Sequence, residues 1–284
     1  MDGIIIVNKP SGYTSHTIVS KIRKVLNIKK VGHTGTLDPL ATGVLPILLG
    51  SGTRLSKYLI NHDKEYIATI KLGVKTDTAD IEGNIIETAD IPTLSEEQIK
   101  TVLKSFEGIQ YQKPPMYSAI KVKGKKLYEY ARKGETIDVQ DRKIEIYNIE
   151  LLKYEAEFIE IKVACSKGTY IRSLCEDIAK KLGTIGTMAK LQRTKVGIFK
   201  LKEALEMDDI EDNKKIQDKL ITAEELFKNN ASIKLTEQEM SQFLNGVRLA
   251  RKEVDGIYRI YDQTGKFVGL GENKDGKLKR DWVE

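Results

Sequence analysis

The sequence predicts an α+β protein with a small β-rich module at its C-terminal end. Two features predict this. Runs with strand periodicity alternate with helical segments that begin at capping residues, as expected when helices pack on a sheet. The last part of the chain then holds three strand runs, IYRIYD, KFVGLGE and KLKRDWV, separated by QTG and NKDG turns. At 284 residues the chain is long enough for a large core and a second, smaller domain.

The N-terminal part reads as strands and helices in turn. Residues 3 to 7, GIIIV, predict a buried strand, and a helix with a basic face is expected from about Ser15 to Leu26. VLPILLG predicts a second strand, which we expect Pro46 to break because proline cannot donate to a strand ladder. A short helix at about 52 to 61, a strand over KEYIATIKLG and a hairpin turn at DIEGN follow.

The middle of the chain departs from this pattern. Ser95 and Gln98 form a capping box that opens a helix to about Phe106. Residues 109 to 150 then contain a Pro-Pro pair and the Lys- and Tyr-rich stretch KVKGKKLYEYARKG, which predict a partly exposed excursion from the core. FIEIKVACSKG predicts a strand that ends in a turn.

A domain boundary is expected near residue 230. Residues 205 to 230 are charged and lack a clear core period, which predicts a linker. Beyond it, Thr236 and Glu239 form a capping box, and Gly246 is the expected helix stop. We therefore expect domains at 1–230 and 231–284, the first with its insertion at about 109–150.

Composition favours an anionic partner and argues against a metal protein. The net charge is +6 and the sequence pI is near 9.0, and basic residues cluster at 21 to 30 and at 121 to 126. Cys165 and Cys175 match neither a metal spacing nor a disulfide framework, and the three histidines are widely spread. No segment has the pattern of a signal peptide or the length of a membrane span, so we expect a reduced, cytoplasmic protein.

The stretch VGHTGTLDPLATGVLPILLG, residues 31 to 50, presents one aspartate in a loop of turn residues. Asp38 precedes Pro39, and the residue before a proline is held in extended geometry. The glycines around it allow dihedrals that other residues resist. Such a loop can aim one carboxylate outward from a rigid frame, although an Asp-Pro pair is also common at ordinary turns. From the residues alone, both interpretations stay open.

A second stretch, CSKGTYIRSLCED, carries an arginine suited to pairing with an anion. Ser173 and Glu176 have the spacing of a capping box, which predicts a helix that begins after Ser173. Residues 169 to 172 would then be extended, with Tyr170 and Arg172 on one face. The planar fork of Arg suits a carboxylate or a phosphate. The commoner fate of such a pair is a surface Arg beside a half-buried Tyr.

Other polar positions are less specific. Tyr66 begins a strand, where aromatics usually pack in cores, and Lys9 stands at an ordinary strand exit. Asp77 and Asp80 could bind Mg²⁺ or serve in acid–base chemistry, but a capped turn is the simpler interpretation. The sequence has no phosphate-binding Gly-rich loop, dinucleotide fingerprint, Ser-His-Asp order or zinc signature. This narrows the chemistry to a reaction that needs one carboxylate and no cofactor.

Five motifs in order resemble those of the TruB family of bacterial tRNA pseudouridine synthases. They are NKPSGYTSH, GHTGTLDPLATGVLPILLG, KEYIATIKLG followed by TDTAD, QKPPMYSAIKVKGKKLYEYARKG, and CSKGTYIRSLCEDIAKKLG. The C-terminal module is similar to a PUA domain, an RNA-binding β-barrel. The resemblance implies a pseudouridine synthase fold, with a mixed, largely antiparallel sheet flanked by helices and a small C-terminal barrel. It also implies isomerisation of the uridine at position 55 in the T loop of tRNA, with no cofactor and no metal.

The resemblance also implies residue roles. Asp38 matches the catalytic aspartate, which acts as a nucleophile or as a base on the sugar, and Arg172 matches the arginine that pairs with it. Tyr66 matches the tyrosine that stacks on the target base and is a candidate to remove the C5 proton. The expected substrate-binding and supporting residues are His33, Tyr170, Lys9, Asp80, Lys123, Lys125 and Lys126.

Two other functions remain as alternatives. One is a tRNA-binding or tRNA-folding protein, although the complete set Asp38, Tyr66 and Arg172 argues against lost catalysis. The other is a guide-RNA-dependent pseudouridine synthase, which works in a multiprotein particle. The segment QKPPMYSAIKVKGKKLYEYARKG argues against it, because it resembles the tRNA-gripping insertion of the stand-alone enzymes. We expect a monomer that binds the T stem-loop of tRNA and no membrane.

Overall fold

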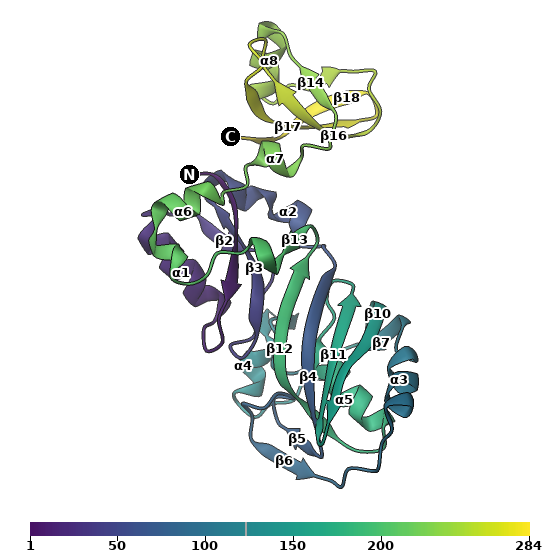
Figure 1. Cartoon of the computed structure of the whole chain (residues 1–284). Helices are drawn as coiled ribbons and strands as arrows, with labels where there is room; N and C mark the ends of the chain where they lie inside the picture. Colours follow the sequence, from purple (N-terminus) through teal and green to yellow (C-terminus); the bar gives the residue numbers. More distant parts are fainter. Residues whose placement is uncertain (123) are drawn as a thin grey trace.

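The computed structural model describes residues 1–122 and 124–284, and Figure 1 shows a large sheet with a smaller one near the two chain termini. Among these residues, β3 and β12 run parallel and every other neighbouring pair of strands in the large sheet is antiparallel. The strands are, in spatial order, β1 (Gly3–Lys9), β3 (Thr42–Leu49), β12 (Gly186–Val196), β4 (Lys64–Leu72), β11 (Phe158–Cys165), β10 (Arg142–Glu155) and β7 (Gly108–Gln112), with β2 (Val31–His33) beside β3 and β13 (Phe199–Lys200) beside β12.

Helices pack on this sheet and complete its core. α1 (Ser15–Val25) contacts β2, α3 (Glu96–Lys104) contacts β10, and α5 (Ile171–Lys181) contacts β12. Apolar side chains of the strands pack with those of these helices in one cluster of buried residues. The expected α+β class, with a mixed and largely antiparallel sheet, is confirmed.

Several local predictions are confirmed. The segment expected as a short helix forms the 3-10 helix η1 (Gly50–Leu55) and α2 (Ser56–Leu59), and DIEGN turns the chain between β5 (Val74–Thr76) and β6 (Ile85–Thr88). The Ser95–Gln98 capping box is present at the start of α3. The prediction that Pro46 breaks this strand is wrong, because β3 continues through Pro46 to Leu49.

The position of Pro46 explains why it does not break the strand. Its carbonyl accepts a hydrogen bond from the Thr34 N–H at 3.3 Å, so its ring nitrogen faces the same edge. β2 ends at His33, one residue before this point. The missing N–H of Pro46 therefore faces the end of the short ladder to β2, and the longer pairing of β3 with β1 loses no hydrogen bond.

The start of α5 also differs from the expectation. α5 begins at Ile171 with Tyr170 as its N-cap, so Arg172 lies in the first helical turn rather than on a strand. Ser173 does not cap the helix, because its hydroxyl donates to the carbonyl of Lys113 at 3.3 Å. The Gln112 side chain instead holds the N-cap, by accepting from the Tyr170 N–H at 2.8 Å and donating to the Tyr170 carbonyl at 2.9 Å. A tertiary contact thus replaces the predicted local cap.

The segment expected as a linker folds back on the large sheet. Leu205 pairs with β1 through its N–H to the Ile6 carbonyl and its carbonyl to the Asn8 N–H, both at 2.8 Å. Ile210 and Ile216 are fully buried. The segment follows η2 (Leu201–Glu203), and its elements are η3 (Asp209–Glu211), α6 (Asn213–Asp218) and α7 (Ala223–Leu226). The linker prediction is therefore wrong. The buried residues of this segment are few and widely spaced among charged ones, so they give no clear core period.

The Lys- and Tyr-rich excursion leaves the sheet between β7 and β10. Residues 109–112 and 142–150 belong to these two strands, so only residues 113–141 lie off the sheet. The described elements of the excursion are β8 (Lys121–Val122), β9 (Lys125–Lys126) and α4 (Leu127–Ala131). Lys123 lies outside the described residues.

The C-terminal module is a five-stranded sheet that packs on the large domain. Its strands are β14 (Ser232–Lys234), β16 (Gly256–Tyr261), β17 (Phe267–Lys274), β18 (Lys277–Val283) and β15 (Leu249–Ala250), and α8 (Glu237–Leu244) begins at the predicted Thr236–Glu239 capping box. Trp282 donates from Nε1 to the Ser51 carbonyl at 3.0 Å, and Asp281 pairs with Lys57 and Tyr58. Trp282 also shares an apolar cluster with Ile4 and Leu55 of the large domain. The two domains are therefore joined by a shared core.

Candidate active site

Asp38 and Arg172 form an ion pair that joins two distant parts of the chain. Arg172 Nε lies 3.0 Å from Asp38 Oδ2, and Arg172 Nη2 donates to Asp38 Oδ1 at 3.4 Å. The guanidinium is buried, with 6% of the side chain exposed, whereas the Asp38 side chain is 33% exposed. The structure thus brings together the two residues that the sequence singled out, with the carboxylate toward the solvent.

The remaining donors of Arg172 are also in use. Nη1 donates to the Thr78 carbonyl at 3.0 Å, and Nη2 donates to the Tyr117 carbonyl at 2.7 Å. Nη1 also lies 3.8 Å from the Asp80 carboxylate. The guanidinium therefore connects α5, the β5–β6 turn and the base of the excursion, and its orientation toward Asp38 is fixed.

The backbone around Asp38 is anchored from behind. Lys9, which is fully buried, donates from Nζ to the carbonyls of Pro39, Pro10 and Tyr13 at 3.1, 2.9 and 2.7 Å. The Ser15 hydroxyl accepts from the Leu37 N–H at 2.8 Å. Lys9, expected among the substrate-binding and supporting residues, thus holds the loop and has no exposed surface.

The electrostatics of Asp38 reflect a balance. Burial raises the pKa of the Asp38 carboxyl above its ordinary value, while the neighbouring Arg172 guanidinium acts to lower it. The Asp80 carboxylate raises the pKa of Asp38 further, and the Lys9 ammonium lowers it. The net direction is upward, so the site makes Asp38 a stronger base than a free aspartate.

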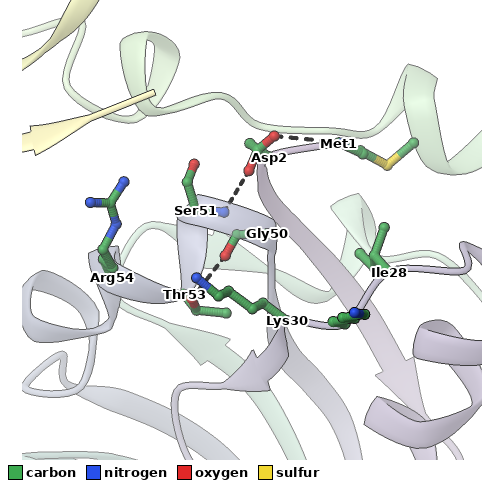
Figure 2. Close-up of a pocket in the computed structure, with 9 residues that line it drawn as sticks. Met1, Asp2, Ile28, Lys30, Gly50, Ser51, Thr53 and Arg54 are labelled. Atoms are coloured by element: carbon green, nitrogen blue, oxygen red, sulfur yellow. Dashed lines mark hydrogen bonds and ion pairs between the residues drawn. The ribbon is translucent and has the colours of Figure 1, made fainter.

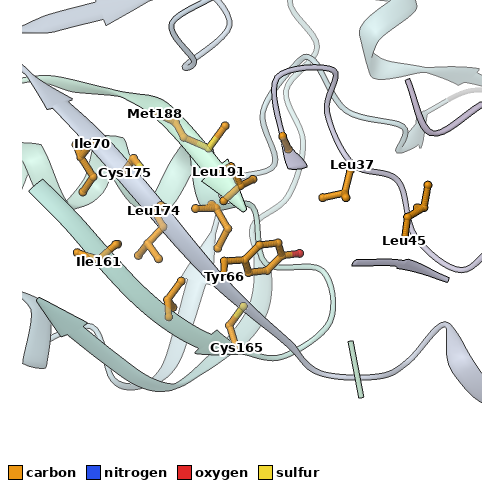
Figure 3. Packing of buried hydrophobic residues seen from close by; sticks show 14 of the residues in the cluster. Leu37, Leu45, Tyr66, Ile70, Ile161, Cys165, Leu174, Cys175, Met188 and Leu191 are labelled. Atoms are coloured by element: carbon orange, nitrogen blue, oxygen red, sulfur yellow. The ribbon is translucent and has the colours of Figure 1, made fainter. Parts of the chain in front are cut away.

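Tyr66 lies on β4 beneath this loop. Figure 3 shows its ring among Leu37, Leu45 and Leu191. The hydroxyl points to the side where Leu37 and Leu45 lie, and Leu37 directly precedes Asp38 in the loop. Tyr66 is only 6% exposed, and burial raises the pKa of its hydroxyl. The Asp38 carboxylate also raises the pKa of this hydroxyl, so Tyr66 lies close enough to Asp38 to belong to the same site, in a buried environment.

The other predicted site residues flank this centre. The Asp80 carboxylate accepts from the Thr78 hydroxyl at 2.7 Å and from the Glu82 N–H at 3.2 Å, which fixes it beside Arg172. Tyr170 is half-buried and is the N-cap of α5. His33 ends β2, and burial lowers the pKa of its imidazole. Its Nδ1 has no hydrogen-bond partner among the described residues.

Lys125 and Lys126 lie on β9 of the excursion and are not among the residues that contact Asp38 or Arg172. Lys125 is exposed, and Lys126 lies over the ring of Tyr128, with Nζ 5.4 Å from the ring centroid. Among the described residues, neither lysine has a carboxylate within 4.0 Å. The excursion contacts the Asp38–Arg172 pair near its start, where the Tyr117 carbonyl accepts a hydrogen bond from Arg172.

Two residues of the site were not singled out from the sequence. Gln112 caps α5, and Arg193 on β12 donates to carbonyls of the Asp38 loop. A sequence signal for Arg193 is its place two residues after Leu191 on the same strand, which puts the two side chains on one face. A charged residue at a core position of a strand is unusual and requires partners.

Figure 2 shows a different hollow, a shallow pocket of about 570 Å³ near the N-terminus, with Lys30 and Arg54 among its lining residues. It lies at the Gly3 end of β1, whereas Lys9 at the other end supports the Asp38 loop. No group of three or more potential ligand side chains is placed to hold a metal ion in the described part of the chain. No helix in that part could span a membrane.

The site combines a carboxylate of raised basicity, a fixed guanidinium and a buried tyrosine. A carboxylate held in this way can attack a sugar carbon or remove a proton from one. An aromatic ring beside it can receive a nucleobase.

Comparisons with known proteins agree with this chemistry. Residues 23–171 match the model described as TruB family pseudouridylate synthase (N terminal domain). Residues 172–237 match the tRNA pseudouridylate synthase B C-terminal domain, and residues 231–279 match the model called Pseudouridine synthase II TruB, C-terminal.

Relatives are similar over nearly their whole length. The tRNA pseudouridine synthase B of Francisella philomiragia is 45% identical over 98% of this chain and 93% of its own. That of Clostridium tetani is 46% identical over 97% of both chains. Among solved structures, a Cbf5-Nop10-Gar1 complex has a chain with a TM-score of 0.72 and 27% identity, which covers 99% of this chain and 86% of that one. An H/ACA RNP bound to a substrate RNA containing 2′-deoxyuridine gives a TM-score of 0.71 at 26% identity, with coverage of 99% and 84%.

Proposed function

Because the chain belongs to the TruB family of pseudouridylate synthases, we propose that it isomerises uridine 55 in the T loop of tRNA to pseudouridine, with Asp38 as the catalytic carboxylate. The observation that supports this assignment most strongly is the Asp38–Arg172 pair, with 3.0 Å between Oδ2 and Nε, on a loop anchored by Lys9. It gives the site one partly exposed carboxylate on a rigid backbone.

The reaction exchanges one bond to the sugar for another. The N1–C1′ bond breaks, the uracil turns within the site, and C5 bonds to C1′. C5 then loses its proton and N1 gains one, so the product is an isomer of the substrate. Asp38 begins this sequence by attack on C1′ or by removal of a sugar proton. Both routes need the ionised carboxylate, and the reaction calls for no cofactor or metal.

Tyr66 and Arg172 serve the same step. A base stacked in an RNA loop must be flipped out, which costs a few kcal/mol. Stacking on an aromatic ring recovers about 1–3 kcal/mol per base. Tyr66 is 6% exposed, so the uracil would contact only the small exposed part of its ring. Arg172 opposes the effect of burial on Asp38 and so favours the ionised carboxylate.

The rest of the chain would bind the RNA. We assign residues 1–230 to catalysis, with the excursion gripping the T stem-loop through Lys123, Lys125 and Lys126, and residues 231–284 to RNA binding. His33, Tyr170 and Asp80 line the site, and Lys9 supports it. A monomer in the cytoplasm is sufficient for this reaction, since every assigned residue comes from one chain.

The test is to incubate the purified protein with full-length tRNA and with a T stem-loop transcript, and to map pseudouridine at each position. We expect conversion at position 55 in both RNAs without added guide RNA or partner protein. Conversion that requires a guide RNA would favour the guide-dependent alternative. Binding without conversion would favour a tRNA-folding protein. The 45% identity to enzymes named tRNA pseudouridine synthase B supports the first outcome.

A further inference from the structure

Arg193 is a buried cation that lies between the Asp38 loop and Tyr66. It belongs to β12 and is 2% exposed. Among the described residues, no carboxylate lies within 4.0 Å of its guanidinium, so the charge is balanced by carbonyl oxygens. A buried charge with such partners is costly to keep, and its position suggests what it does.

The partners of Arg193 come from both ends of the loop that carries Asp38. Nη2 donates to the Gly35 carbonyl at 3.1 Å and Nη1 to the Thr36 carbonyl at 3.4 Å, just before Asp38. Nε donates to the Val44 carbonyl at 2.8 Å, after the loop has entered β3. One planar group therefore ties the entry of the loop to its exit.

The backbone of Arg193 is equally close to the loop exit. Arg193 is next to Gly43 in the parallel pairing of β12 with β3. Gly43 has φ +105°, and a Cβ there would lie 2.2 Å from the Arg193 carbonyl oxygen. Only glycine allows this approach, so the loop exit and β12 form one rigid unit.

On its other side, β12 pairs with β4, and Arg193 is directly opposite Tyr66. Side chains of directly paired residues lie on the same face of a sheet. Arg193 thus lies beside Tyr66, and its positive charge acts to lower the pKa of that hydroxyl against the effect of burial.

We propose that Arg193 is a positioning residue of the isomerisation, which fixes the Asp38 loop relative to Tyr66. It does not contact the substrate, because it is buried behind the loop. This inference rests on the proposed function, since the reaction is what requires Asp38 and Tyr66 to be held in register. A shift of about 1 Å in such a constellation can reduce a rate 100-fold.

The test compares Arg193→Lys and Arg193→Met with Ile159→Ala, a matched control in the core of β11 that is fully buried and outside the site. Thermal unfolding identifies a temperature at which every variant tested is folded. At that temperature we measure the tRNA dissociation constant and the single-turnover rate of pseudouridine formation at saturating tRNA. Lysine keeps the charge but cannot donate to the two ends of the loop through a planar fork.

We expect Arg193→Lys to lower the single-turnover rate at least tenfold, and Arg193→Met to lower it further, with tRNA affinity within about threefold of wild type. Ile159→Ala should lose stability but keep the wild-type rate. If Arg193→Met does not fold, the rate of Arg193→Lys alone tests the proposal. A folded Arg193→Lys protein with a rate within twofold of wild type would overturn the proposal.

Hydrogen exchange of residues 35–44 provides a readout that does not depend on activity. We expect faster exchange in Arg193→Lys than in wild type and no change in Ile159→Ala. Unchanged exchange in Arg193→Lys would also count against the proposal. Absence of pseudouridine with the wild-type protein would refute the proposed function instead, so the two failures are distinguishable.

Discussion

Arg172 Nε lies 3.0 Å from Asp38 Oδ2, and the same guanidinium binds two carbonyls of other segments. These two hydrogen bonds fix the orientation of the Arg172 guanidinium toward Asp38. Burial nevertheless raises the pKa of the Asp38 carboxyl above its ordinary value. Two opposing effects therefore set the pKa of Asp38: burial raises it and the Arg172 charge lowers it. The pH dependence of activity tests how much each contributes.

Replacing Arg172 by Met should move the acid limb of the activity profile to higher pH. Loss of the guanidinium removes the largest influence that lowers the pKa of Asp38, while the effect of burial remains. The ionised fraction of Asp38 then falls over the acid limb of the profile, and the rate there falls with it. Single-turnover rates measured from pH 5 to pH 9 would show the shift, with Arg172→Lys as a control that keeps the charge. An acid limb at the wild-type pH would contradict this account of the pair.

Lys9 should leave a signature in stability at alkaline pH. Burial lowers the pKa of its ammonium from 10.5 to about 8. Between these two values the unfolded chain binds a proton that the folded chain does not, so the free energy of unfolding rises with pH. Below pH 8 both states are protonated and this contribution does not change.

The measurement is urea unfolding of wild type and Lys9→Met at several pH values from 7 to 10. The difference between the two proteins isolates Lys9 from tyrosines that also titrate in this range. We expect the wild type to gain stability relative to the variant as pH rises through 8. Parallel curves would show that Lys9 titrates normally in the folded protein.

Replacing Lys125 and Lys126 by Gln should flatten the salt dependence of tRNA binding. Each phosphate contact removed lowers the slope of log K against log salt by roughly 0.7 to 0.9. Replacing Lys123 as well should add a similar amount. Turnover at saturating tRNA should change little, since neither lysine is among the groups that contact the Asp38–Arg172 pair. Lys180→Gln, an exposed lysine near the C-terminal end of α5, serves as the control. A wild-type slope in the double variant would show that the RNA does not bind the excursion.

The C-terminal module should contribute to stability as well as to binding. Trp282 is 2% exposed and packs in a cluster shared with the large domain. Trp282→Ala should therefore reduce the free energy of unfolding by about 3–5 kcal/mol, with little effect on the rate at saturating tRNA. Urea unfolding and single-turnover assays test this. The control is Val254→Ala, because the Val254 side chain is 80% exposed. A loss below about 1 kcal/mol would indicate that the module is only loosely attached.

Much of the fold followed from local patterns. The capping boxes at Ser95 and Thr236 depend on residues three apart, and both helices start where these residues predict. Strand periodicity placed β1, β4 and β11 well, because half-buried or buried strands leave a clear pattern.

The errors came from contacts between distant segments. The Ser173 pattern suggested a cap, but the Gln112 side chain, 58 residues before Tyr170 in the chain, holds the start of α5 instead. Pro46 stays within a strand because of where β2 ends. The segment from Leu205 to residue 230 was predicted as a linker because its own sequence shows no core period. Leu205 and Ile221 pair with β1, which is far away in the sequence. No local pattern encodes such partners.

The site shows the same division. Motif order identified Asp38, Tyr66 and Arg172, and the geometry places all three in one centre. The place of Arg193 two residues after Leu191 indicates only a core-facing position. Its role was not predicted because its partners are backbone carbonyls, which carry no sequence signature.

The most direct test of the account is Asp38→Asn, which is nearly isosteric and removes the carboxylate charge. The single-turnover rate of pseudouridine formation at position 55 should become undetectable with saturating tRNA, while the dissociation constant stays within a few-fold of wild type, because phosphate contacts elsewhere dominate affinity. Wild-type turnover by a folded Asp38→Asn protein would contradict the assignment of Asp38, and with it the mechanism proposed for this site.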